Sequence, residues 1–137
     1  LVQTFSPDNP AIMAATKHDY LGFAAGEIPN RDAFGYPPFG LLARVVIRSE
    51  SQERAKQMGE HITAAIQQAA DELQTEIVVL GPAPAPVEKL RGKHRFHILI
   101  RSAIDSPLQP VIRRASAMVQ AADEVQWIVD VDPIDML

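Results

Sequence analysis

The chain has 137 residues, no cysteine and a formal net charge of −4, with 47% hydrophobic and 22% charged residues. This is the composition of an ordinary globular domain, and it excludes disulfides and thiolate metal sites. No apolar run approaches the roughly 20 residues that a membrane-spanning helix needs. The N-terminus lacks an initiator Met and the features of a secretory signal. We therefore expect a cytoplasmic piece of a longer protein.

The first part of the chain predicts a helix and then a stiff connection. Residues 6–28 carry a loose apolar face, and either Asp8 or Asn9 can cap this helix. Residues 34–40, FGYPPFG, hold two prolines and two glycines, which favour an extended connection. A domain boundary is therefore expected at this connection.

Residues 41–48, LLARVVIR, alternate in polarity, which predicts a strand with one buried face. The apolar face comprises Leu41, Ala43, Val45 and Ile47. Arg44 and Arg48 lie on the opposite face. Because side chains alternate along a strand, the two arginines are expected to share one surface of the sheet.

Residues 49–73 predict a long amphipathic helix with either Ser49 or Ser51 as its N-cap. Its apolar stripe comprises Ala55, Met58, Ile62, Ala65, Ile66, Ala69 and Leu73. Residues 76–82 then predict a short, mostly buried strand. The alternating prolines that follow predict an extended segment outside any sheet: Pro82, Pro84 and Pro86.

Gly92 predicts a turn, and residues 95–101, RFHILIR, predict the next strand. Its apolar side comprises Phe96, Ile98 and Ile100, and its other side comprises Arg95, His97, Leu99 and Arg101. Residues 106–122 predict a second helix, opened by either Ser106–Pro107 or Gln109–Pro110. The core face of this helix comprises Leu108, Val111, Ile112, Ala115, Met118, Val119 and Ala122. Residues 124–133 predict a last strand, with Trp127 in the core.

From residue 40 onward the predicted order is β-α-β-β-α-β, the split βαβ arrangement of ferredoxin-like domains. We therefore predict an α+β fold in which two helices cover one face of a four-stranded antiparallel sheet. The predicted domains are an N-terminal helical arm over residues 1–39 and this βαββαβ domain over residues 40–137. If the first and third strands pair, the uncovered face collects basic side chains: Arg44, Arg48, Arg95, His97 and Arg101.

Charge along the chain is uneven, because residues 89–114 sum to +6 while the segments on both sides are negative. The predicted loop in this segment carries Lys89, Arg91 and Lys93, next to His94. Guanidinium groups bind phosphate oxygens bidentately, so the loop and the uncovered face together form a candidate anion-binding surface. The face offers no exposed aromatic residues for base stacking, which predicts backbone contact with weak sequence preference.

Two other interpretations of this basic surface remain open. It can dock onto an acidic protein surface, or nearby acids such as Asp130 and Glu50 can simply neutralise it. The sequence contains no GxxxxGK[ST] phosphate loop and no GxGxxG, so we expect no enzymatic activity from this chain. Its four histidines lack metal-ligand spacing. The aspartates at 130, 132 and 135 are interpreted as a polar strand end.

Several motifs, in order, resemble the C-terminal end of the primosomal protein N′ family of bacterial replication-restart helicases. They are LVQTFSPDNPAI, GYPPF, VLGPAPAPVEKLRGKHRFHILIRS and VQWIVDVDPIDML, which extend from the first residue to the last. The resemblance implies a ribosomal-S10-like βαββαβ domain, preceded by the tail of the second helicase lobe. Residues 1–5 would then be a strand separated from its lobe.

The resemblance also implies a role in DNA replication restart and primosome assembly. The parent protein would be an ATP-dependent 3′→5′ DNA helicase, whose ATP, Mg²⁺ and zinc sites lie upstream, so no cofactor is expected here. The family motif K.RGK.R supports Lys89, Arg91, Gly92, Lys93 and Arg95 as residues that face branched or single-stranded DNA. Expected protein partners are the helicase core, the acidic tail of single-stranded-DNA-binding protein and other primosome proteins, with no membrane partner.

Overall fold

The computed structural model describes residues 2–120 and 122–133. The elements follow in the order α1 (Pro10–Thr16), α2 (Tyr20–Ala33), β1 (Gly40–Ser49), α3 (Gln52–Glu72), β2 (Ile77–Leu90), β3 (Lys93–Ala103), α4 (Leu108–Met118) and β4 (Val125–Val131). The predicted α+β class and βαββαβ order are confirmed. No helix in the described ranges is long and apolar enough to cross a membrane.

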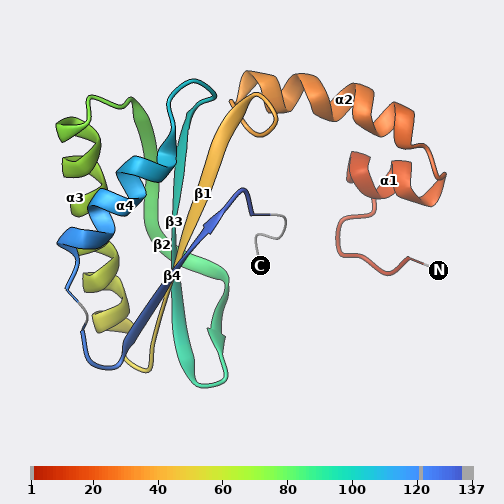
Figure 1. Cartoon of the computed structure of the whole chain (residues 1–137). Coiled ribbons are helices and arrows are strands. Elements are labelled where there is room, and N and C mark those ends of the chain that lie inside the picture. The colour runs from red at the N-terminus through yellow and green to blue at the C-terminus, as the bar shows by residue number, and fades with distance from the viewer. Residues whose placement is uncertain (1, 121, 134–137) are drawn as a thin grey trace.

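The four strands form one antiparallel sheet in the order β2-β3-β1-β4. The expected pairing of the first and third strands of the domain is confirmed, because Gly40 of β1 lies opposite Ala103 and Ser49 lies opposite His94. α3 and α4 lie together on one face of this sheet (Figure 1), while α1 and α2 stand apart beside the end where β1 begins. The opposite face, which α3 and α4 leave uncovered, is the open face of the sheet.

The core lies between the sheet and the two helices that cover it. Ile47, Ile98 and Ile100 from the central strands are fully buried against Val111 of α4. The predicted stripe of α3 is buried from Ala55 to Ala69, whereas Leu73 caps the helix C-terminus and is exposed. Each strand's alternation and the helical period direct these apolar side chains to one shared layer, and their removal from water is the main stabilising contribution.

The first helix was predicted as one element, and this prediction was wrong. The chain forms α1 and α2, separated at residues 17–19, and His18 adopts a positive φ of 54°. Asn9 caps α1, and Asp19 caps α2 by accepting a hydrogen bond from the Gly22 amide at 2.8 Å. The first amides of a helix have no carbonyl acceptor within that helix. The Asp19 side chain supplies an acceptor for one of them, so a new helix can begin in the middle of the segment.

The prediction that the alternating prolines lie outside the sheet was also wrong. β2 continues through them to Leu90, with irregular pairing on both sides of Pro84. β2 is an edge strand, so a proline there costs no ladder hydrogen bond when its nitrogen faces outward. The same edge position explains why Val78 and Leu80, expected to be mostly buried, are 46% and 45% exposed.

The remaining boundaries settle the alternatives that were left open. Ser51 caps α3 by accepting from the Arg54 amide, and α4 begins after Pro107. α4 ends at Met118 rather than continuing to residue 122, and Ala122 is exposed. Trp127 is half-buried and packs against the core as predicted. Residues 2–5 form no strand, and Leu1 and Asp135 lie outside the described residues.

Candidate nucleic-acid interface

The basic loop of the sequence is the tip of the β2–β3 hairpin. Leu90 pairs with Lys93, so Arg91 and Gly92 form a two-residue turn, with φ values of 50° and 82°. Positive φ at both central positions is the geometry that matches the twist of a hairpin, and glycine adopts it without steric cost. The predicted turn at Gly92 is confirmed, and it holds the neighbouring basic side chains at one end of the sheet.

The strand register brings the predicted basic residues of the open face together. Arg48 of β1 lies directly opposite Arg95 of β3, and Val46 lies opposite His97. On the other side of β1, Arg48 lies opposite Gln126 of β4. Lys93 completes the group, because its Nζ donates to Gln126 Oε1 at 3.2 Å. The hairpin tip is therefore continuous with the end of the open face.

Two of the predicted residues are buried rather than exposed. Arg44 is 7% exposed and Arg95 is 6% exposed. Arg44 donates from Nη2 to Asp130 Oδ2 at 3.4 Å, so the expected neutralisation by Asp130 is realised at this arginine. The sequence predicted that all of these arginines are accessible on the open face. That prediction was wrong for Arg44 and Arg95, while Arg48 and Arg101 remain half-buried.

A bulge in β2 accounts for the burial of Arg95. Residues 85–88 stand opposite the single residue Arg95, because Pro84 pairs with Phe96 and Lys89 pairs with His94. Ala85 is 4% exposed, and Arg95 Nη1 donates to the Val87 carbonyl at 3.4 Å. Extra residues in one strand bend that strand locally. Here they bring the bulge against the Arg95 guanidinium and shield it from solvent.

His97 lies between the two buried arginines on the open face. Burial lowers the pKa of His97, and the positive charges of Arg44 and Arg95 lower it further. All three effects oppose protonation, because the charged imidazolium would lose hydration and face two cations. His97 is therefore neutral at physiological pH, and it adds no positive charge to the surface.

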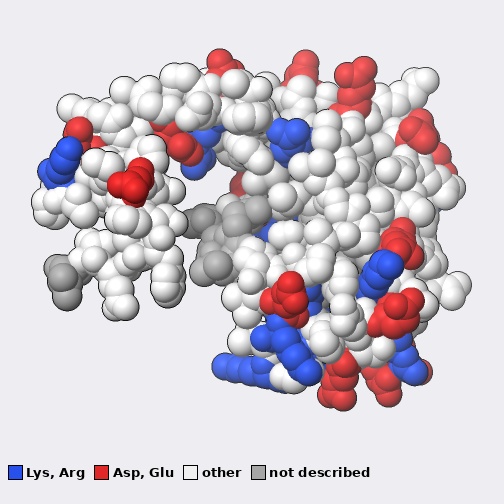
Figure 2. Space-filling view, turned by 180° about the vertical axis from the view of Figure 1, so that it is seen from behind, with Lys and Arg blue, Asp and Glu red and all other residues white. Residues whose placement is uncertain are grey.

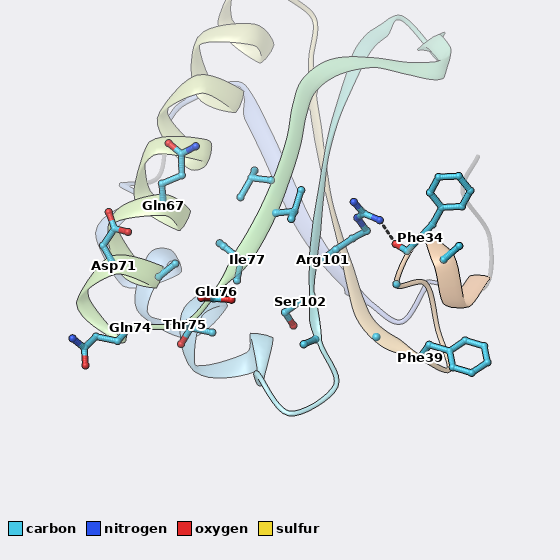
Figure 3. Close-up of a pocket in the computed structure, with 17 residues that line it drawn as sticks. Phe34, Phe39, Gln67, Asp71, Gln74, Thr75, Glu76, Ile77, Arg101 and Ser102 are labelled. Carbon is cyan, nitrogen blue, oxygen red and sulfur yellow. Dashed lines mark hydrogen bonds between the residues drawn. The ribbon is translucent and has the colours of Figure 1, made fainter. Parts of the chain in front are cut away.

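The far end of the open face closes onto the connection that precedes β1. Arg101 donates to the Phe34 carbonyl, and its guanidinium lies 5.4 Å from the centre of the Tyr36 ring. Figure 3 shows Arg101 pointing toward Phe34. Both residues line a groove of about 1030 Å³. The groove's other charged residues are Asp71 and Glu76, so its lining does not suit phosphate. Arg101 therefore holds the connection that precedes β1 and does not belong to the basic group at the hairpin.

One group of accessible basic residues lies at the hairpin, while other exposed cations, such as Lys56 and Arg113, lie on the helical face. Lys89, Arg91 and Gly92 are exposed, and Lys93 and His94 are half-buried. Figure 2 shows Lys and Arg side chains projecting from the lower end of the βαββαβ domain, the end at which Figure 1 places the hairpin. Acidic side chains lie at the same end. The register places Glu124 at this end, because the next residue, Val125, lies opposite Ser49, and Glu124 pairs with Arg54 at the start of α3.

Arg48 joins the exposed cations to the open face. It is half-buried, and its Nε has no hydrogen-bond partner among the described residues. A buried guanidinium nitrogen without a partner favours an incoming acceptor.

The contact between Lys93 and Gln126 was not predicted from the sequence, although pairing β4 with β1 would have placed Gln126 beside Arg48.

The fold and the site together define a βαββαβ domain with a basic hairpin at one end of its sheet. Among protein families, the primosomal protein N C-terminal domain matches residues 32–134, and the chain belongs to this family. Its full length is similar to the C-terminal fifth of bacterial proteins called replication restart protein PriA.

Three of these relatives show how far the similarity extends. The PriA of Treponema pallidum is 34% identical over 141 residues, covering 100% of this chain and 20% of the relative. The PriA of Borreliella burgdorferi is 30% identical over 137 residues, with the same two coverages. The PriA of Thermotoga maritima is 31% identical over 133 residues, covering 97% of this chain and 16% of the relative. The chain spans about a fifth of the length of its relatives.

Proposed function

We propose that this chain is a DNA-binding module of a replication-restart helicase, and that its β2–β3 hairpin contacts the DNA backbone. The observation that carries the proposal is the basic tip of a hairpin, where Lys89 and Arg91 are exposed and Lys93 is half-buried, in a chain whose net charge is −4. Localised cations in an acidic protein are the footprint of a polyanionic partner. Membership of a family with replication-restart relatives supports DNA as that polyanion.

The geometry of the hairpin suits phosphate contact better than base reading. A two-stranded ribbon fits a DNA groove, and Lys and Arg at its tip can neutralise phosphates on both sides. The open face presents the half-buried Arg48 beside this tip, with Gln126 next to it. Neutralising phosphates releases counterions whatever the base sequence, so the contact would position DNA and would discriminate little between sequences.

The buried arginines have another role in this proposal. Arg95 holds the β2 bulge, and Arg44 is paired with Asp130. DNA contact is therefore assigned to the tip and to Arg48, with Arg44, Arg95 and His97 supporting the sheet beneath. ATP hydrolysis, 3′→5′ unwinding and the binding of Mg²⁺ and zinc are assigned to upstream parts of a longer protein.

The test is fluorescence anisotropy with labelled forks and single strands, titrated from low to moderate salt. Arg91→Glu combined with Lys93→Glu should weaken binding similarly for unrelated DNA sequences. The slope of log affinity against log salt should fall by about 0.9 for each phosphate that the variant no longer neutralises. These two side chains are chosen because the hairpin tip holds them away from the core.

A matched control changes the same charge on the helical face. Lys56 and Arg113 are exposed on α3 and α4, so Lys56→Glu combined with Arg113→Glu alters the net charge equally. The control should reduce affinity much less than the hairpin pair. Equal reductions from both variants would mean that net charge, and not the hairpin, governs binding, and the proposal would fail.

The alternative function is a protein-docking module, and the N-terminal helices favour it. α1 and α2 contain no buried residue, and they expose Tyr20 and Leu21 at 75% and 79%. Helices this short need tertiary contacts to be stable in water, which a helicase core could supply. The basic hairpin would then meet an acidic protein segment, such as the tail of single-stranded-DNA-binding protein. Comparing the salt dependence of binding to a short DNA and to an acidic peptide separates the two functions.

A further inference from the structure

The hairpin tip carries an apolar side chain that the core does not use. Leu90 is 49% exposed, and Val87 in the adjoining bulge is 39% exposed. Leu90 belongs neither to the buried core nor to the half-buried apolar residues that pack against it. Hairpin ends are ordinarily polar, so the fold itself gives no reason for a leucine at this position.

The adjacent residues of Leu90 along the chain and across the hairpin are basic, and the exposed Glu88 lies two positions before it. Lys89 and Arg91 flank it along the chain and are exposed, and Lys93 is its partner across the hairpin. Cross-strand partners point to the same side of a hairpin, so Leu90 lies on the side of Lys93. Lys93 in turn reaches Gln126, which lies opposite Arg48 on the open face. Leu90 is thus an exposed apolar side chain beside Lys89, Arg91 and Lys93. In the proposed contact these three cations would face a phosphate backbone.

This combination suits the end of a base stack. Apolar side chains, leucine among them, insert between bases where a protein also binds the neighbouring DNA backbone. In a continuous duplex, insertion must first separate two stacked base pairs, which costs free energy. At a branch point the terminal base pair already has one uncovered face. A leucine can cover that face without the cost of separation, and its own apolar surface is removed from water.

We propose that Leu90 is an apolar wedge that recognises the exposed base pair at a DNA branch point. This inference rests on the proposed DNA contact of the hairpin and adds a source of structural preference to it. The cations at the tip bind any DNA backbone, whereas Leu90 favours a junction over a uniform duplex.

The test compares Leu90→Ala with the unchanged chain on a fork and on a duplex of equal length. The substitution should lower affinity for the fork by roughly five- to tenfold, since about half of a leucine side chain is left to bury. Affinity for the duplex should stay within about twofold. A 2-aminopurine placed at the branch point should also change its fluorescence with the unchanged chain and much less with Leu90→Ala.

Leu80→Ala is the matched control. Leu80 is 45% exposed on the same strand but pairs with Leu99 in the middle of the sheet, away from the tip. Leu80→Ala should leave the affinities for the fork and for the duplex unchanged. Leu90→Met should keep the fork preference, because methionine retains the apolar volume. Leu90→Lys should strengthen duplex binding while removing the preference.

The outcomes separate this inference from the proposed function. If Leu90→Ala leaves the ratio of fork to duplex affinity unchanged while the Arg91 and Lys93 reversals still weaken binding, the wedge is overturned and the DNA contact stands. If those charge reversals leave all binding unchanged, the DNA contact is overturned and the wedge falls with it.

Discussion

The two N-terminal helices and the βαββαβ domain hold their shape in different ways. Among the described residues, every buried apolar side chain lies between Leu42 and Ala115, whereas α1 and α2 bury none. Of the 16 exposed large hydrophobic residues in the described part of the chain, half fall before residue 40. The domain is stabilised by burial, and the helices rely on capping and local hydrogen bonds. Short helices of the second kind gain little stability from local interactions alone.

Hydrogen bonds nevertheless hold the connection between the two regions in a defined conformation. Arg31 donates from Nη1 to the Pro37 carbonyl, and Arg101 of β3 donates to the Phe34 carbonyl. Gly40, where β1 begins, has no room for a side chain, since an added Cβ would lie 2.4 Å from the Gly35 carbonyl oxygen. The division after residue 39 stays a prediction, and paired substitutions can test whether the two regions contribute unequally to stability.

The largest expected difference comes from truncating one isoleucine in each region. Ile98 is fully buried in β3, and Ile98→Ala should lower the free energy of unfolding by about 2–5 kcal/mol. Ile28 in α2 is 50% exposed, and Ile28→Ala should change it by less than about 0.5 kcal/mol. Urea unfolding followed by circular dichroism measures both. Similar decreases would show that α2 shares the core's stability and that the two regions do not differ in this way.

A smaller difference is expected from adding a methyl group to one glycine in each region. An added Cβ at Gly59 of α3 would lie 2.7 Å from Pro82 Cβ, so Gly59→Ala should cost about 1–3 kcal/mol of unfolding free energy. Gly26 of α2 has no atom within 4 Å of such a Cβ. Gly26→Ala should therefore leave unfolding unchanged or raise helicity, since alanine favours helix by about 0.5–1 kcal/mol. Thermal unfolding distinguishes the two, and a stabilised Gly59→Ala would contradict the packing of Pro82 on α3.

The smallest expected effect is a pH dependence confined to the domain. The folded chain holds the pKa of His97 below its usual value of 6.5, so the unfolded chain binds a proton first as the pH falls. The stability that neutral His97 provides is complete above about pH 6.5 and is lost as the pH falls toward the folded pKa. His97→Gln should flatten this dependence in unfolding midpoints measured between about pH 5 and pH 7.5. His18→Asn, at an exposed position between α1 and α2, should leave it intact.

Much of the domain could be predicted because its elements have clear periods. Alternation placed Phe96, Ile98 and Ile100 on the buried side of β3, and the 3.6-residue period placed Ala55 to Ala69 in the core. Gly92 marked the hairpin turn. These signals are local: each depends on the chemistry of one segment, so each is readable without knowing which segments are neighbours.

The accessible part of the site could not be predicted in the same way. Alternation put Arg44, Arg48 and Arg95 on one face, and the structure confirms that placement but buries two of the three. The burial of Arg95 depends on the bulge in β2, where four residues stand opposite one, and this bulge is defined only by the register with β3. Prolines suggested a segment outside the sheet, because propensity does not say whether a strand will lie at an edge.

Within the βαββαβ domain, the order of strands and helices, the apolar side of the central strands and of α3, and the positive charge on both sides of Gly92 could all be read from the sequence alone. The tertiary structure decided which of those charges meet solvent and where Leu90 lies among them. This division arises because periodicity specifies only the side to which a residue points. What covers that side depends on contacts between segments far apart in the chain, such as the carbonyl of Val87 against Arg95 and the carboxylate of Asp130 against Arg44.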